Sequence, residues 1–198
     1  MDYSQDDIIA LHKQYALSPA TFDLVFTHCQ IVCDIALQLL AQRPQAIDVD
    51  LVKTGCLLHD IGVYPLFDAH NQLRKDRNYV SHGIEGEKIL KKNGFPQTIQ
   101  RIASHHTGVG LTKQDIIDQK LPLPSQDYVA ETPEERLVMY ADKFHSKTTP
   151  PYFNSFDWYV ADVARFGQDK VAAFLKLADE FGKPDLAALS QKYGHTIR

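Results

Sequence analysis

The sequence His-Asp-Ile-Gly at residues 59–62 is the stretch on which the interpretation of this chain turns. It ends an apolar segment that opens near Asp50 and has the length of a helix. Gly62 is expected to cap the C-terminus of that helix and to permit close packing of the backbone. His59 and Asp60 are therefore predicted at a helix end, where two ligand types could chelate one metal ion. The pair alone is weak evidence, because it arises by chance about once in several hundred residue pairs.

Two further polar residues lie beside apolar stripes of predicted helices. His28 lies on the buried side of a long helix that begins at Pro19, and taken alone it is interpreted as a core histidine satisfied by a hydrogen bond. Asp142 lies near the end of a helix that Thr132 starts with a capping box. An unpaired carboxylate is costly to bury there, so either a nearby cation or a salt bridge with Lys143 is expected.

All of the strong local signals are helical, so an all-α fold is predicted. The expected helices, bounded by capping residues, prolines and glycines, cover about residues 19–42, 50–58, 81–93, 96–106, 133–145 and a short stretch from 112. Residues 63–79 are predicted as a long loop, and no segment alternates as a strand does. Adjacent prolines at 150–151 precede three short helical patterns that stop near Gly167, Gly182 and Gly194. We predict a domain over residues 1–148 and a C-terminal helical extension, over residues 149–198, packed on the same domain.

The bulk composition excludes several classes of protein. A net charge of -4 and a pI of about 6.1 provide no basic stripe, so nucleic acid is not an expected partner. The uninterrupted apolar runs are far shorter than the roughly 20 residues of a membrane span, and no membrane association is expected. The first residues lack the basic start of a secretory signal, and the three cysteines form no Cys-x-x-Cys pair. A cytoplasmic location is the simplest expectation.

Several separated pieces of the sequence occur in an order that one superfamily shares. They are His28, residues 59–62, Tyr-Val-Ser-His-Gly at 79–83, His-Thr-Gly-Val-Gly-Leu-Thr at 106–112, and Tyr-Ala-Asp-Lys at 140–143. Together they cover roughly residues 19–146, and they resemble the HD-domain superfamily of metal-dependent phosphohydrolases in its HDIG variant. The closest resemblance is to uncharacterised HDIG-domain hydrolases of bacteria and archaea. The segment 108–110 lacks the Tyr and Pro of the HD-GYP signature, which disfavours that subfamily of cyclic-dinucleotide phosphodiesterases.

The resemblance implies a bundle of about five core helices with metal ligands projecting inward from different helices. The positions that match the first-metal ligands are His28, His59, Asp60 and Asp142. The positions that match the second-metal ligands of binuclear members are His82, His106 and the bridging Asp60, with His105 as an alternative to His106. His82 could instead bind substrate phosphate or be solvated.

The implied chemistry is hydrolysis of a phosphate ester or anhydride by a metal-activated water, as in a phosphomonoesterase or phosphodiesterase. One or two divalent ions are expected, and the ligand set accommodates Fe, Mn, Co, Ni or Zn. We predict His59, Asp60 and Lys143 as the catalytic residues. Lys143 adjoins a ligand in the family pattern, so it is expected to contact phosphate or to support that ligand; otherwise it is an ordinary solvated lysine.

The expected substrate is a small phosphorylated metabolite, with nucleotides as the leading class. The alternative is a non-catalytic regulatory HD module that binds a metal ion or nucleotide. An RNA-processing phosphodiesterase is a third hypothesis, but it requires a basic groove that the acidic total disfavours. The aromatic-rich segment from Thr148 to Arg198 could shape the pocket, pack in the core or form a homodimer contact.

Overall fold

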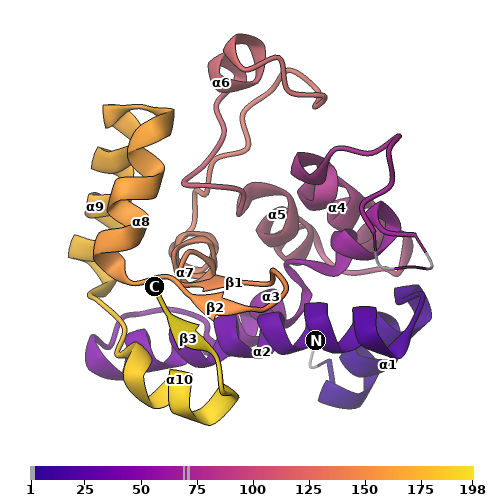
Figure 1. Cartoon of the computed structure of the whole chain (residues 1–198), viewed down its shortest axis with the longest axis horizontal. Coiled ribbons are helices and arrows are strands. Elements are labelled where there is room, and N and C mark those ends of the chain that lie inside the picture. The colour runs from indigo at the N-terminus through magenta and orange to yellow at the C-terminus, as the bar shows by residue number, and fades with distance from the viewer. Residues whose placement is uncertain (1–2, 69, 71) are drawn as a thin grey trace.

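A computed structural model of the chain describes residues 3–68, 70 and 72–198 and shows a mostly helical fold (Figure 1). In chain order the elements are α1 (Gln5–Tyr15), α2 (Pro19–Gln42), α3 (Val49–Leu58), the 3₁₀ helices η1 (Ile61–Leu66) and η2 (Tyr79–Ser81), α4 (His82–Lys92), α5 (Gln97–His105), α6 (Lys113–Asp118), α7 (Pro133–Asp142), β1 (His145–Ser146), β2 (Tyr152–Phe153), α8 (Phe156–Val163), the 3₁₀ helix η3 (Ala164–Phe166), α9 (Gln168–Phe181), α10 (Leu186–Tyr193) and β3 (Thr196–Ile197). The predicted all-α class is confirmed, with one small sheet added.

Helix α2 runs across the lower part of the view in Figure 1, and α1, α3, α7, η1 and β1 contact it. The Ser18 side chain accepts a hydrogen bond from the backbone N–H of Thr21, and Pro19 occupies the first turn, as the sequence predicts. Among the described residues, α2 alone is long and apolar enough to cross a membrane, with a mean hydropathy of 1.6. Its buried face contacts α1, α3 and α7, and core helices of soluble proteins pass the same test.

The buried apolar side chains form two clusters that meet along α2. One cluster contains residues of α1, η1, α4, α5 and the N-terminal half of α2. The other contains residues of α3, α7, α9 and the C-terminal half of α2. Cys29 belongs to the first cluster and Ile31 to the second, so His28 lies close to the boundary between them. His28 therefore lies in the middle of the helical bundle.

The predicted C-cap role of Gly62 is wrong. Helix α3 ends at Leu58, and Gly62 lies inside η1 without a positive φ angle. Its close packing is confirmed, because a β-carbon at this position would lie 2.0 Å from the carbonyl oxygen of His82. The absence of a side chain therefore allows the start of α4 to pass directly over the end of the His-Asp segment.

Three other local predictions need correction. Of residues 63–79, which were predicted as a loop, residues 63–66 belong to η1 and Tyr79 begins η2. Ser81 makes no side-chain cap for α4; instead Asn78 accepts from the backbone of Val80 and starts η2. Helix α7 ends at Asp142 rather than near residue 145.

The predicted Thr132 cap of α7 is confirmed, because the Thr132 hydroxyl accepts from the backbone N–H of Glu135. The second half of the predicted capping box is not formed: the Glu135 side chain accepts from the backbone N–H of Glu131 instead of that of Thr132.

The sequence did not predict the small three-stranded sheet. Strand β2 pairs antiparallel with β1 and parallel with β3, so that β2 lies in the middle. Each strand has two residues, which is too short for the alternation by which strands are recognised. The sheet brings the C-terminal segment of the described chain back to the end of α7, above α2 (Figure 1).

The C-terminal helices pack on α7. The ring of Phe174 in α9 lies 5.3 Å from that of Tyr140, and the Tyr140 hydroxyl donates to the carbonyl of Gly182. Both aromatic side chains are fully buried. Part of the aromatic material after residue 148 therefore lies in the core, and the division at residues 148 and 149 stays a prediction.

Candidate metal centre

Three separate segments bring the first predicted group of ligands together. His28 comes from the middle of α2, His59 and Asp60 follow α3, and Asp142 ends α7. The Nε2 atom of His28 lies 2.9 Å from Oδ1 of Asp142, 3.2 Å from Oδ2 of Asp60 and 3.3 Å from Nε2 of His59. One ligand atom from each residue lies within 4.8 Å of all the others. Such a cluster of imidazole and carboxylate donors suits a divalent first-row metal.

The second predicted group shares Asp60 with the first. The Oδ1 atom of Asp60 lies 3.6 Å from Nε2 of His82 and 3.6 Å from Nε2 of His106. The two histidine Nε2 atoms are 2.9 Å apart. The two oxygens of Asp60 therefore face different sets of histidines, which is the geometry of a bridging carboxylate.

Backbone carbonyls orient three of these imidazole rings in the same way. In each case Nδ1 lies 2.7 Å from the carbonyl oxygen three residues earlier: His59 on Cys56, His82 on Tyr79 and His106 on Ala103. A carbonyl oxygen can only accept, so each Nδ1 carries the proton. Each Nε2 therefore faces inward, toward Asp60, and in a neutral ring its lone pair is available to a metal ion.

The Asp60 carboxylate is the best evidence that a cation belongs here. It is fully buried, and among the described residues no donor makes a hydrogen bond of normal geometry with either oxygen. The Lys147 ammonium makes a close ion pair with Oδ2. Burial alone would raise the pKa of Asp60, but Lys147 and His59 outweigh it and hold that pKa well below its ordinary value. The carboxylate is charged and lacks hydrogen bonds, so the residues present fit a bound cation.

The ammonium group of Lys143 is buried and bonded to Asp142. Its ammonium donates to Oδ2 of Asp142 at 2.7 Å and to the carbonyl of His106 at 2.9 Å. Burial would raise the pKa of Asp142, yet Lys143, followed by His28 and His59, holds it well below the usual range. Of the roles predicted for Lys143, this placement favours support of a ligand over direct contact with phosphate.

The structure distinguishes between the two adjacent histidines. His106 reaches Asp60, whereas the Nδ1 of His105 lies 2.8 Å from the Ser104 hydroxyl and its ring packs beside Tyr128. His105 also lies outside both groups of ligand atoms. The geometry therefore favours His106 as the ligand, in agreement with its spacing from Gly108 in the sequence.

Sequence reasoning missed two residues that the fold brings to the centre. His145 has its Nδ1 atom 2.8 Å from Nδ1 of His28, and Lys147 pairs with Asp60. Both lie on β1 or just after it, in a stretch that was interpreted only as a helix end and a domain boundary. No periodicity marks either residue, because their positions depend on the turn after α7 and on pairing with distant strands.

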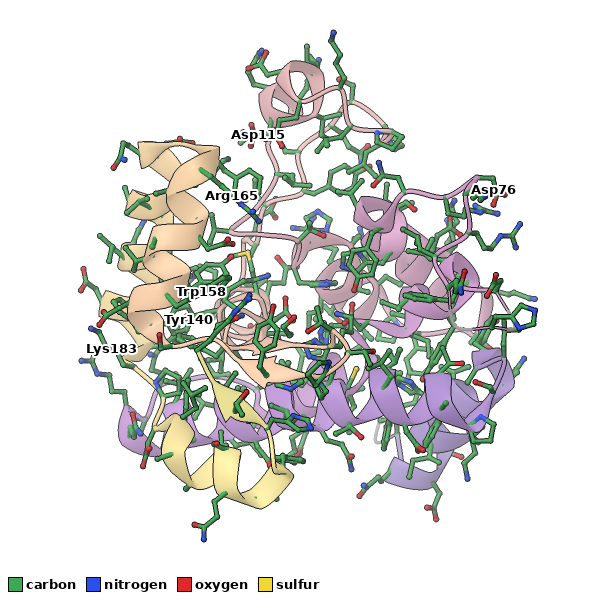
Figure 2. All side chains as sticks on the ribbon, viewed as in Figure 1. Asp76, Asp115, Tyr140, Trp158, Arg165 and Lys183 are labelled. Atoms are coloured by element: carbon green, nitrogen blue, oxygen red, sulfur yellow. The ribbon has the colours of Figure 1, made fainter. Side chains whose placement is uncertain are left out.

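A cleft of about 1040 Å³ opens next to the two groups of ligands. One side is lined by Asp142, Lys143, His145 and Lys147, and the other by residues of α8 and η3. Figure 2 shows Trp158 and Arg165 on the side of this segment that faces the rest of the molecule. The cleft thus combines aromatic surface with positive charge beside the candidate metal centre.

Comparison with known families agrees with this geometry. The family model described as "HD domain" matches residues 25–147, a range that contains all six predicted metal ligands. The chain belongs to the HD-domain family. The HD match ends before α8, so the helices that line the far side of the cleft lie outside it.

Two archaeal proteins illustrate where related HD domains occur. The chain is 40% identical over 124 residues to a tRNA (cytidine(56)-2'-O)-methyltransferase of Picrophilus torridus, covering 63% of this chain and 32% of that protein. It is 36% identical over 121 residues to an uncharacterized protein of Methanocaldococcus jannaschii, covering 60% of this chain and 64% of that protein. The matches span less than two thirds of either relative, so they concern the HD domain and not the whole of those proteins.

A solved structure shows the same fold. The HD domain of the phosphodiesterase PgpH of Listeria monocytogenes, in complex with cyclic-di-AMP, aligns with a TM-score of 0.54 and 19% identity over 96% of this chain and 99% of that one. By sequence, the cyclic-di-AMP phosphodiesterase PgpH is 32% identical over 117 residues, which is 52% of this chain and 16% of that protein. The HD-domain fold therefore extends over nearly the whole of the present chain.

Proposed function

We propose that this HD-domain protein is a metal-dependent hydrolase of a phosphate ester or anhydride in a small phosphorylated metabolite. The observation that carries the proposal is the buried Asp60 carboxylate, whose two oxygens face two sets of inward-pointing histidine nitrogens beside a cleft. Buried carboxylate oxygens rarely lack a hydrogen bond of normal geometry in a structural core, whereas two such oxygens beside histidine nitrogens are expected where one or two divalent cations bind.

Each residue has a distinct role in this proposal. The first ion would be held by His28, His59, Asp60 and Asp142, and the second by Asp60, His82 and His106. Divalent ions at these positions would supply a nucleophile at neutral pH, by lowering the pKa of a bound water, and would polarise the phosphoryl oxygen. The Nδ1 hydrogen bonds hold the imidazole rings in place, and Lys143 holds Asp142.

The cleft supports a nucleotide as the substrate class. Lys147 and Arg165 place cationic side chains along it, and Trp158, with the Arg198 guanidinium 3.5 Å from its ring centroid, adds an aromatic surface that a base could join. The HD domain of PgpH binds cyclic-di-AMP, and its overall fold is similar. A cyclic dinucleotide therefore belongs among the compounds to test, although the HD-GYP signature is absent.

The alternative is a regulatory HD module that binds metal or nucleotide without turnover. Both hypotheses use the same ligands, so only a measurement of turnover separates them. Purified protein is incubated with manganese, iron or zinc and a panel of nucleoside phosphates, cyclic dinucleotides and a short RNA. Saturable release of phosphate or mononucleotide, lost in His59→Ala and Asp60→Ala, is the expected result. Tight binding of nucleotide without turnover under all metal conditions supports the regulatory module.

A matched control removes a neighbouring histidine that lies outside the centre. His105→Ala deletes an imidazole one residue from the predicted ligand His106, but its contacts are to Ser104, Arg101 and Tyr128. We expect this variant to retain turnover, whereas His106→Ala loses most of it. Equal loss in the two variants would show that the effect comes from damage to α5 rather than from loss of a metal ligand.

A further inference from the structure

His28 is oriented differently from the other predicted ligand histidines. Its Nδ1 atom faces the Nδ1 of His145 at 2.8 Å, where the other rings face a backbone carbonyl. The Nε2 atom of His145 in turn lies 3.0 Å from Nδ1 of His195. The ring of His145 stacks on that of His28, with centroids 5.1 Å apart, and on that of His195, with centroids 5.2 Å apart. A continuous chain of imidazoles thus runs from the metal centre to a partly exposed residue near β3.

The same atomic positions accept two arrangements of protons, because one nitrogen of each contact must donate and the other must accept. In the first arrangement His28 carries its proton on Nε2 and donates to Asp142, and His145 and His195 carry theirs on Nδ1. In the second arrangement His28 carries its proton on Nδ1, and the other two carry theirs on Nε2. All three rings are neutral in both arrangements. Conversion of the first into the second moves one proton across each of the two ring contacts. Nε2 of His28 releases one proton to solvent and Nε2 of His195 takes one from solvent, so the number of protons on the three rings does not change.

Only the second arrangement leaves the Nε2 lone pair of His28 free for a metal ion. We propose that His145 and His195 are positioning residues that form a histidine relay, which holds His28 in its metal-binding tautomer and transmits metal binding to His195. The proposal rests on the metal centre of the proposed function. It assigns to the C-terminal segment a role in metal binding that the HD match does not cover, because His195 lies beyond residue 147.

The small sheet supports this relay mechanically. His145 lies on β1, opposite Phe153 of β2, and Phe153 pairs with Ile197 of β3, two residues beyond His195. The edge of the Phe153 ring also contacts His145, with centroids 5.1 Å apart. The Ser190 hydroxyl donates to the backbone carbonyl of His195 and fixes that residue from the side of α10. The sheet therefore sets the spacing of the second and third rings.

The direct test is the tautomer of each histidine, measured by long-range ¹H–¹⁵N correlation spectra of ¹⁵N-labelled full-length protein. The spectra are recorded without metal and with zinc, a diamagnetic probe, at a pH where His195 is neutral. We expect the zinc-loaded protein to carry the proton on Nδ1 of His28 and on Nε2 of both His145 and His195. A His145 proton that stays on Nδ1 with zinc bound overturns the relay.

Variants measure how much the relay contributes to metal affinity. His145→Leu removes the acceptor for Nδ1–H of His28, and zinc affinity is expected to fall about 10- to 100-fold, as for other partners of metal ligands. His145→Asn places an amide oxygen near the former Nδ1 atom and is expected to restore most of that affinity. Wild-type affinity in His145→Leu, or no rescue by His145→Asn in a folded protein, contradicts the proposal.

Two further variants keep the test decisive if His145→Leu fails to fold. His195→Ala changes a partly exposed residue, so the protein should fold, and we expect a several-fold loss of zinc affinity because the Nε2–H of His145 loses its acceptor. His12→Gln, at a buried histidine outside the metal centre, should leave zinc affinity unchanged. Failure of the wild-type protein to bind zinc contradicts the metal centre and the relay together, whereas zinc binding without the expected tautomers contradicts the relay alone.

Discussion

A β-carbon on Gly62 would lie 2.1 Å from the backbone nitrogen of Gly86, one helical turn into α4. Both the His-Asp segment and His82 depend on this contact, because Gly62 follows Asp60 by two residues and the atom nearest to its β-carbon position is the carbonyl oxygen of His82. The approach of two backbones, rather than a side-chain interaction, therefore determines the distance between the two groups of predicted metal ligands.

Substitution of Gly62 by alanine is expected to lower the free energy of unfolding by about 3 kcal/mol or more, because backbone atoms must move to admit a methyl group. Urea denaturation measures this loss. Gly55→Ala is the matched control, since the nearest atom there is the flexible end of the Ile102 side chain, at 2.5 Å. Comparable losses in the two variants would show that the contact with α4 has no special importance.

Divalent metal should stabilise the folded protein. Metal present at 100 times its dissociation constant adds about 2.7 kcal/mol to the free energy of unfolding, which for a chain of this size corresponds to a rise in Tm of roughly 5–10 °C. Differential scanning calorimetry with and without manganese or zinc measures the shift. Asp60→Ala should abolish it, because Asp60 is common to both groups of ligands. An unchanged Tm in the wild-type protein would argue against a metal centre.

Loss of His106 should change the number of metal ions bound rather than abolish binding. His106 belongs only to the second group of ligands, with Asp60 and His82. If the wild-type protein binds two ions, His106→Ala should bind one, as measured by elemental analysis of protein prepared without chelator. Two ions retained in this variant would exclude His106 from the second site.

Lys147 should make the protein less dependent on metal for its stability. Its ammonium neutralises buried Asp60, so Lys147→Met leaves that carboxylate uncompensated, at a cost of about 3 kcal/mol in metal-free protein. Bound metal should recover most of the loss, so the metal-induced rise in Tm should be larger in the variant than in the wild type. Lys53→Met, which breaks an exposed pair with Asp50, should change stability by less than about 1 kcal/mol.

Acid should destabilise the fold through His12 as well as through the metal centre. The Nε2–H of His12 donates to the carbonyl of Leu57, and its Nδ1 accepts from the Tyr64 hydroxyl. Burial lowers the pKa of His12 from 6.5 to about 4, so between these values the unfolded chain binds more protons than the folded one. The free energy of unfolding should therefore fall by about 2 kcal/mol from pH 7 to pH 5 on account of this residue.

The His12→Gln variant tests that contribution. Glutamine keeps a donor near the position of Nε2 but does not titrate, so the variant should lose less stability than the wild type over the same interval. Urea denaturation at pH 7 and at pH 5 gives the two differences. Parallel losses in variant and wild type would assign the acid sensitivity to other groups.

The candidate ligands could be named because the pieces of sequence that carry them occur in a fixed order along the chain. Six metal ligands were predicted from that order, and the structure places all six side chains in two groups around Asp60; their binding of metal stays a prediction. Local capping chemistry also predicted the starts of α2 and α7, where Ser18 and Thr132 accept backbone hydrogen bonds three residues on. Helix α1 was not predicted, although the Ser4 cap and the buried pair Ile8 and Leu11 are ordinary helix signals.

The remaining features depend on contacts that no local pattern encodes. Gly62 was expected both to end a helix and to permit close backbone packing, but only the structure shows that the backbone packed against it is that of α4. His145 and Lys147 reach the centre because α7 stops at Asp142 and the chain then turns into a two-residue strand. That strand pairs with β2, which pairs in turn with β3 more than forty residues further along the chain, and a two-residue strand leaves no periodic trace in the sequence.

The cleft is lined by two parts of the chain. Most of its lining residues up to Lys147 lie in the segment that matches the HD domain, whereas Trp158, Arg165 and the other residues of α8 and η3 come after the last matched residue. Residues 149–198 can therefore differ between related chains, and with them the shape and charge presented to a ligand, while every predicted metal ligand stays where it is. Grafting this segment between related chains accordingly tests whether it sets ligand preference beside an unchanged candidate metal centre.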